Sequence, residues 1–286
     1  MKLIIILVAL NLPTLVHAQI PNDPSFFANA QIQSTVPEAF AVQEKSIPFL
    51  KLQRARFQSD VLRLVNSIRT DKNLILAITR FPNLSLEQKA EVMRQTFTHV
   101  TKSLGIMPPL LVLDNNFKNA TYFDFDLKNP SPGRVILSPK ELAAMPNPYS
   151  PLLYLIHETK HSAQFQLAFS KQTGSSSILA KSYRAAFTAQ KDLQGKLSFS
   201  DFLTLVSEYD AFQYGNAVVA LLKGEKASDE RMGTYASQFD QHGRLKIDLI
   251  QLFETHGAAN FLSAFNLLEV PQWKIIRNPN GNNRRF

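Results

Sequence analysis

Residues 150–165, SPLLYLIHETKHSAQF, carry the pattern His157-Glu158-Thr159-Lys160-His161 inside a long apolar run. Ser150 followed by Pro151 is typical of a helix start, and neither glycine nor proline interrupts the run that follows. Side chains four residues apart lie one above the other on a helix, so both imidazoles share a face and could bind one zinc ion. Glu158 projects beside them, where it could take a proton from a zinc-bound water.

The residues on both sides of this motif favour a metal site over a chance pair of surface histidines. They are mostly leucine, isoleucine, alanine and phenylalanine, which indicates a largely buried helix. A buried helix rarely carries two histidines and a glutamate unless those side chains have partners. We therefore predict that His157 and His161 bind zinc and that Glu158 is the catalytic residue.

The first 18 residues predict export. Lys2 supplies a positive start, Leu3 to Leu10 form an apolar run, and Val16-His17-Ala18 is a small-residue cleavage site. This run is too short to cross a bilayer, so we expect a secreted or periplasmic protein with no stable membrane span in the mature chain. The sequence has no cysteine, which excludes a disulfide framework and leaves stability to the core and the metal.

The charge balance bears on the partners of the chain. The formal charge of +8 falls to +7 when residues 1–18 are removed, because Lys2 is the only charged side chain lost. Such a balance favours anionic surroundings, for example a cell-surface polymer. No run of arginine and lysine is interleaved with aromatics, so no nucleic-acid partner is expected.

The composition divides the mature chain into four parts. Residues 19–48, rich in proline, glutamine, serine and asparagine, predict an extended or partly disordered arm, with an inhibitory pro-segment as the alternative. Residues 49–105 form an N-terminal helical part, with helices expected over Pro48–Arg80 and from a capping box at Ser85 to Leu104. Residues 106–225 form the core around the motif, and 226–286 a C-terminal helical part with a basic tail.

The period of the pattern changes after Gly105. Three short strands are expected, at Pro109–Asp114, Thr121–Asp126 and Arg134–Leu137. Helices follow at Ser150, at Ser175–Gln194, and from a cap at Ser200 to Lys223. The predicted class is α+β, a mainly helical domain with a small three-stranded sheet preceding the motif helix.

Two histidines are an incomplete catalytic zinc site, because such sites usually take three protein ligands. Glu208 is the best third candidate, since it lies on a long helix 208 − 161 = 47 residues after the second histidine. Small Ala211 and Gly215 on its face would let that helix approach closely.

Several side chains near Glu208 or downstream remain open for other roles. Asp210, His242 and His256 are alternative third ligands. Asp201 or Asp210 could accept a hydrogen bond from the second nitrogen of a ligand histidine.

Over about residues 105–223, the chain resembles the gluzincin branch of the zincin metallopeptidases. The resemblance lies in the order of three features: short strands, then H-E-x-x-H on a helix, then Glu208 in the pattern E-x-x-A on a later helix. This resemblance implies hydrolysis of peptide bonds by attack of zinc-bound water. His157, His161 and Glu208 would be the ligands, and Glu158 the general base and acid. Thermolysin-like members have an aspartate four residues after the ligand glutamate, where this chain has Phe212, so the surroundings of the ligands must differ.

The resemblance also implies a peptide or protein substrate, aligned along an edge strand at Thr121–Asp126. A tyrosine or histidine usually stabilises the developing oxyanion; the candidates are Tyr183, Tyr209, Tyr214, Tyr235, His242 and His256. Two other functions stay open: a zinc amidase acting on cell-wall peptides, and a non-catalytic exported binding protein with a structural metal.

Overall fold

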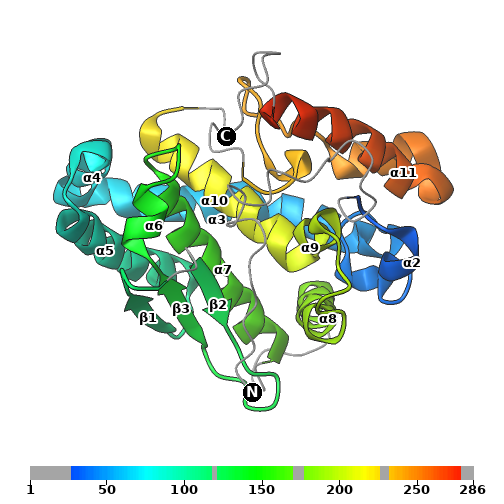
Figure 1. Ribbon diagram of the computed structural model, residues 1–286, viewed down its shortest axis with the longest axis horizontal. Helices are drawn as coiled ribbons and strands as arrows, with labels where there is room; N and C mark the ends of the chain where they lie inside the picture. The colour runs from blue at the N-terminus through cyan, green and yellow to red at the C-terminus, as the bar shows by residue number, and fades with distance from the viewer. Residues whose placement is uncertain (1–26, 118–120, 170–176, 226–231, 278–286) are drawn as a thin grey trace.

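The computed structural model describes residues 27–117, 121–169, 177–225 and 232–277, with side chains described up to residue 269 (Figure 1). The expected signal peptide and nearly all of the basic tail lie outside these ranges. The described chain is mostly helical with one small sheet, which confirms the predicted α+β class. None of its helices is both long and apolar enough to cross a membrane.

The helices have the following bounds: α2 (Ala30–Gln33), α3 (Ile47–Thr70), α4 (Lys72–Thr79), α5 (Leu86–Leu104), α6 (Pro139–Ala143), α7 (Ser150–Phe169), α8 (Ile178–Asp192), α9 (Phe199–Thr204), α10 (Val206–Lys223) and α11 (Leu249–Arg277). Single 3-10 turns lie at Pro37–Ala39, Glu44–Ser46, Phe81–Asn83 and Tyr235–Ser237. The predicted start of α5 is confirmed, because Ser85 and Gln88 form a reciprocal capping box. Helix α11 is kinked at Gly257, whose φ is 69°.

The sheet consists of β1 (Leu110–Leu113), β2 (Thr121–Asp124) and β3 (Arg134–Leu137), at the places where the sequence predicts strands. The strand order is β1-β3-β2, so β3 is central, parallel to β1 and antiparallel to β2. Figure 1 shows the strands beside α7, and β2 and β3 both contact this helix. Within the described chain β2 is therefore an edge strand next to the motif helix.

Helix α7 lies at the centre of the fold, with α5, α8 and α10 packed around it. Its apolar side chains Leu152, Leu153, Leu155 and Ile156 are almost completely buried. The prediction of a largely buried motif helix is therefore confirmed.

Glycine at position 215 sets the distance between α7 and α10. A Cβ atom placed there would lie 3.4 Å from the carbonyl oxygen of Leu153 and 3.9 Å from Cβ of His157. The two helices thus approach closely at the level of the motif, as the small residues on α10 predict.

The region Pro48–Arg80 is helical as predicted, but the chain breaks at Asp71, which divides it into α3 and α4. The Asp71 side chain accepts a hydrogen bond from the backbone N–H of Leu74 and caps α4. His99 of α5 braces this break, with Nδ1 2.8 Å from Ser67 Oγ and Nε2 3.6 Å from Asp71 Oδ2. His99 is thus a structural residue between helices.

The predicted single helix from Ser200 to Lys223 is wrong. Ser198 and Asp201 form the capping box of the short helix α9, and Leu205 then leaves the helical region before α10 begins. At this break Leu205 pairs with Phe40 as an isolated β-bridge, and Ala41 N–H donates to the Thr204 carbonyl over 2.7 Å. A distant segment of the chain therefore splits the expected helix in two.

That segment corrects the expectation for residues 19–48, of which 27–48 are described. Instead of an extended or partly disordered arm, they form α2 and two 3-10 turns, and Ala39, Phe40 and Ala41 are completely buried. The Asp201 carboxylate accepts hydrogen bonds from Asn29 N–H at 2.7 Å and from the Gln33 amide at 3.0 Å. Residues 27–48 are therefore part of the core.

The crossing of α7 and α10 can be tested at Gly215. The variant Gly215→Ala should be as stable as the wild type or more stable by up to about 1 kcal/mol, because alanine favours a helix and its Cβ fits. The variant Gly215→Val should cost about 1–3 kcal/mol, since the branched side chain would press on the Leu153 carbonyl. Urea unfolding of the metal-free proteins measures both, and a valine variant as stable as the alanine variant would contradict the close crossing.

Candidate metal centre

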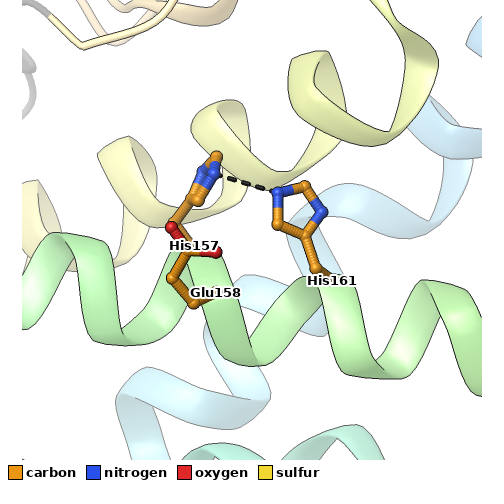
Figure 2. A group of neighbouring side chains, drawn as sticks. All are labelled: His157, Glu158 and His161. Atoms are coloured by element: carbon orange, nitrogen blue, oxygen red, sulfur yellow. Dashed lines mark hydrogen bonds between the residues drawn. The ribbon is translucent and has the colours of Figure 1, made fainter. Parts of the chain in front are cut away.

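His157, Glu158 and His161 lie together on α7 (Figure 2). The Nε2 atoms of the two histidines are 3.0 Å apart. Ligand atoms of all three residues lie within 4.8 Å of one another, and the three side chains are at most 4 % exposed. This buried group could hold a metal ion.

Glu208 reaches the same point from α10. Its Oε2 lies 3.3 Å from Nε2 of His157, and its Oε1 lies 3.3 Å from Nε2 of His161. The close crossing of the two helices thus brings the sequence candidate Glu208 against both imidazoles. His242 and His256, the alternative histidine ligands, are exposed side chains, whereas this group is buried.

The distances fit a small divalent cation. Two nitrogen or oxygen ligands held at about 2.0–2.1 Å by a tetrahedral metal are roughly 3.3–3.4 Å apart. The three distances here, 3.0, 3.3 and 3.3 Å, match that spacing within a few tenths of an ångström.

Unpaired buried atoms support the same interpretation. Within the described chain, Nδ1 of His157, both oxygens of Glu158 and Oε2 of Glu208 are buried without a hydrogen-bond partner. Leaving such atoms unpaired costs free energy, so each calls for an explanation. A cation at this point would bind the Glu208 oxygen directly and would attract the neighbouring Glu158 carboxylate by its charge.

The two carboxylates have different surroundings. Burial raises the pKa of Glu158 to about 8, although the charge of His161, the Thr121 side chain and the Phe123 backbone oppose that rise. Burial also acts to raise the pKa of Glu208, but the charge of His161, followed by the close contacts with both imidazoles, lowers it to about 2. Glu158 therefore lies toward strand β2, where burial favours its neutral form, whereas the imidazoles favour the ionised form of Glu208.

The two histidines differ in the same way. Burial, followed by the charge of His161, lowers the pKa of His157 to about 4. Burial acts to lower the pKa of His161 as well, but the charge and hydrogen bond of Glu208 raise it to about 9. Without a metal, a proton on His161 therefore faces the Glu208 carboxylate, in the position that a cation would take.

The polar neighbours of His161 differ from those predicted. Its Nδ1 lies 2.9 Å from Oε1 of Gln164, and the Gln164 amide lies 2.8 Å from Oδ2 of Asp210. Asp210 therefore reaches His161 through Gln164 and not directly. Asp201, the other expected partner, lies away from the site and binds residues 29 and 33.

Sequence reasoning missed Gln164, although a signal for it exists. It follows His161 by three residues, a spacing that places two side chains on one helix face. A polar side chain at that position of a buried helix needs a partner, and His161 supplies one.

Aromatic rings enclose the site. The ring of Phe212 is 4.0 Å from that of His157, and the rings of Phe123 and Phe187 are 6.2 and 6.3 Å from that of His161. Phe212 packs directly on His157. It stands at the position where thermolysin-like enzymes have an aspartate. The environment is therefore apolar, which strengthens every charge interaction within it.

Tyr154 is a site neighbour that sequence reasoning did not single out. Its ring lies 6.3 Å from that of His157, and burial followed by the charges of Glu158 and Glu208 raises its pKa.

The sequence candidates for the oxyanion donor lie in varied surroundings. The Tyr183 hydroxyl donates to Asp210, Tyr209 accepts from Gln213, and the Tyr214 ring lies 4.7 Å beneath the Lys160 ammonium. The backbone N–H of Tyr235 donates to Glu269, and His242 and His256 are the exposed histidines described above.

A cavity of about 730 Å³ lies between α3 and α7. Its wall includes Lys160, Gln164 and Asp210, but not His157, Glu158 or Glu208. This volume is typical of a small-molecule site. The cavity therefore reaches the polar residues behind His161 and not the candidate metal-binding group itself.

No protein-family model, curated protein or solved structure matches this chain. The resemblance to gluzincins therefore depends on the histidine motif, the spacing of Glu208 and the strands before the motif.

Metal binding should depend on pH in a defined direction. Because the pKa of His161 is raised to about 9, this side chain carries a proton at neutral pH that a metal must displace. The association constant for Zn²⁺ should therefore rise at least about tenfold per pH unit between roughly pH 5 and 8. Calorimetry in buffers of different ionisation enthalpy should detect release of at least one proton, and a pH-independent constant would contradict this arrangement.

Proposed function

We propose that this chain is an exported zinc metallopeptidase. The observation that carries the proposal is the convergence of the nitrogens of His157 and His161 with the carboxylate of Glu208 at 3.0–3.3 Å, beside a fourth buried residue, Glu158. Two imidazoles and one carboxylate are a usual donor set for catalytic zinc, which keeps one position open for water. A bound zinc ion would polarise the scissile carbonyl and bring the pKa of its water close to neutrality.

Glu158 is the proposed general base and acid. A base works best when its pKa lies near the working pH, and burial raises the pKa of Glu158 to about 8. Glu158 would take a proton from the attacking water and deliver it to the leaving nitrogen of the peptide bond. The neutral and ionised forms are then both accessible during turnover.

The substrate would lie along β2. This edge strand lies beside Glu158, because Thr121 and Phe123 both act on its carboxylate. An extended peptide could pair, through backbone hydrogen bonds, with the edge of β2 that no strand of the described chain occupies. Its scissile bond would then lie close to Glu158.

Substrate entry requires a movement. His157 and Glu158 are fully buried and Glu208 is only 2 % exposed. A peptide must therefore displace part of the covering chain before it reaches these residues.

The same burial supports a second candidate function, an exported binding protein in which the metal is structural. A zinc amidase acting on cell-wall peptides is a variant of the first proposal, for which the charge of +8 is mild support.

The variant Glu158→Gln tests the catalytic proposal. It should still bind about one zinc ion per chain, but peptide hydrolysis should fall by about 10²–10⁴-fold, because the general base is lost. Glu91→Gln, a change of the same kind on an exposed face of α5, is the matched control and should keep full activity.

The assay should compare casein with peptidoglycan. Hydrolysis of peptidoglycan alone would favour the amidase. Wild-type protein that binds zinc but cleaves neither substrate would favour the structural metal. A Glu158→Gln variant with full activity would rule out the proposed mechanism.

A further inference from the structure

Gln164 has a hydrogen-bond arrangement that fixes which way round its amide lies. Its Nε2 faces two groups that only accept, the carbonyl oxygen of Ser207 at 3.0 Å and Oδ2 of Asp210 at 2.8 Å. The amide nitrogen must be on that side, so the amide oxygen lies on the other side, 2.9 Å from Nδ1 of His161. The oxygen and nitrogen of a glutamine amide are hard to tell apart, but here the hydrogen-bond partners allow only one orientation.

This orientation determines the state of the His161 ring. An amide oxygen can only accept, so Nδ1 of His161 must carry a hydrogen. In the neutral imidazole the lone pair is then on Nε2, the atom that faces Glu208 and His157. We propose that Gln164 is a positioning residue that holds His161 with Nδ1 protonated and Nε2 directed at the metal. The inference rests on the metal site of the proposed function, but not on hydrolysis.

Asp210 holds Gln164 in place. Besides the Gln164 amide, its carboxylate accepts from Gln53 of α3 at 3.1 Å and from the Tyr183 hydroxyl of α8 at 2.8 Å. The Lys160 ammonium lies 3.4 Å away and balances its charge. One buried carboxylate on α10 thus ties α3, α7 and α8 to the side chain that orients a metal ligand.

The neutral amide between Asp210 and His161 separates orientation from charge. A carboxylate bound directly to Nδ1 would make the imidazole more basic as well as fixing its direction. Gln164 fixes the direction of the His161 ring, while the negative charge of Asp210 interacts with Lys160 and with the Gln164 amide. Glu208 is then the carboxylate that acts directly on His161.

In the described chain, His157 has no side-chain support of the kind that Gln164 gives His161. The Phe212 ring packs on its imidazole, and the backbone of Ala211 is its polar neighbour on α10. Of the two histidines, His161 is therefore the one that another side chain orients. Loss of Gln164 should weaken the better-ordered half of the site.

The test compares three variants. Gln164→Met keeps the length of the side chain but removes the acceptor, so Zn²⁺ should bind about 10–100-fold more weakly in competition with a chelator. The neutral carboxyl group of Gln164→Glu can donate its one hydrogen to Asp210 and still accept from Nδ1, so this variant should recover part of that loss. Gln166→Met is the matched control, because Gln166 lies on the same helix but binds the backbone of Met107, and its affinity should stay within about threefold of wild type.

A second measurement separates positioning from general stability. In the cobalt(II)-loaded wild type and the Gln166→Met variant, the N–H proton of His161 Nδ1 should be visible by NMR and exchange slowly. In Gln164→Met it should exchange fast or disappear. If Gln164→Met does not fold, the same proton in Gln164→Glu decides: slow exchange supports the inference, and fast exchange overturns it.

Unchanged zinc affinity in folded Gln164→Met would overturn the positioning role, even if the wild type hydrolyses peptides. A 10–100-fold loss of affinity in a protein without hydrolytic activity would support positioning and reject only the peptidase proposal. A wild type that binds no metal would reject both.

Discussion

The close crossing of α7 and α10 is the constraint on which the rest of the site depends. Gly215 leaves room for the Leu153 carbonyl, and this contact places Glu208 of one helix 3.3 Å from the two histidines of the other. Glu208 joins the group on α7 only because α10 lies this close. The geometry of the candidate metal centre is therefore a property of helix packing, and any side chain that separates the helices would move Glu208 away from the histidines.

The burial of this crossing has an energetic consequence. Removing two imidazoles and two carboxylates from water is costly, and the cost is reduced only where opposite charges meet. The pair of His161 and Glu208 does so, whereas Glu158 and His157 become neutral. The bare protein thus holds a proton where the bound form would hold a cation, and the surrounding Phe123, Phe187 and Phe212 keep both forms out of water.

The sequence predicts the local features of this molecule well. The motif helix, the capping box at Ser85 and the three strands depend on neighbours along the chain, and all lie where expected. The position of Glu208 also follows from sequence, because small residues on its helix face indicate close packing.

The breaks in the helices at Asp71 and Leu205 do not follow from the sequence. Leu205 leaves the helix because Phe40 pairs with it from 165 positions away, as 205 − 40 = 165, and no local pattern reports such a contact. Gln164 was missed for a related reason, since its importance comes from Asp210 on another helix.

The pairing of Phe40 with Leu205 also has a consequence for how the chain is made. This pairing and the hydrogen bonds from Asn29 and Gln33 to Asp201 join two segments of the core that lie far apart in the sequence. The ribosome therefore produces the two segments at different times. The backbone bridge of Phe40 to Leu205 and the bond from Ala41 to Thr204 can form only after residue 205 has been made. Contacts of such long sequence separation form slowly. This part of the core should therefore be completed late in the synthesis of the chain.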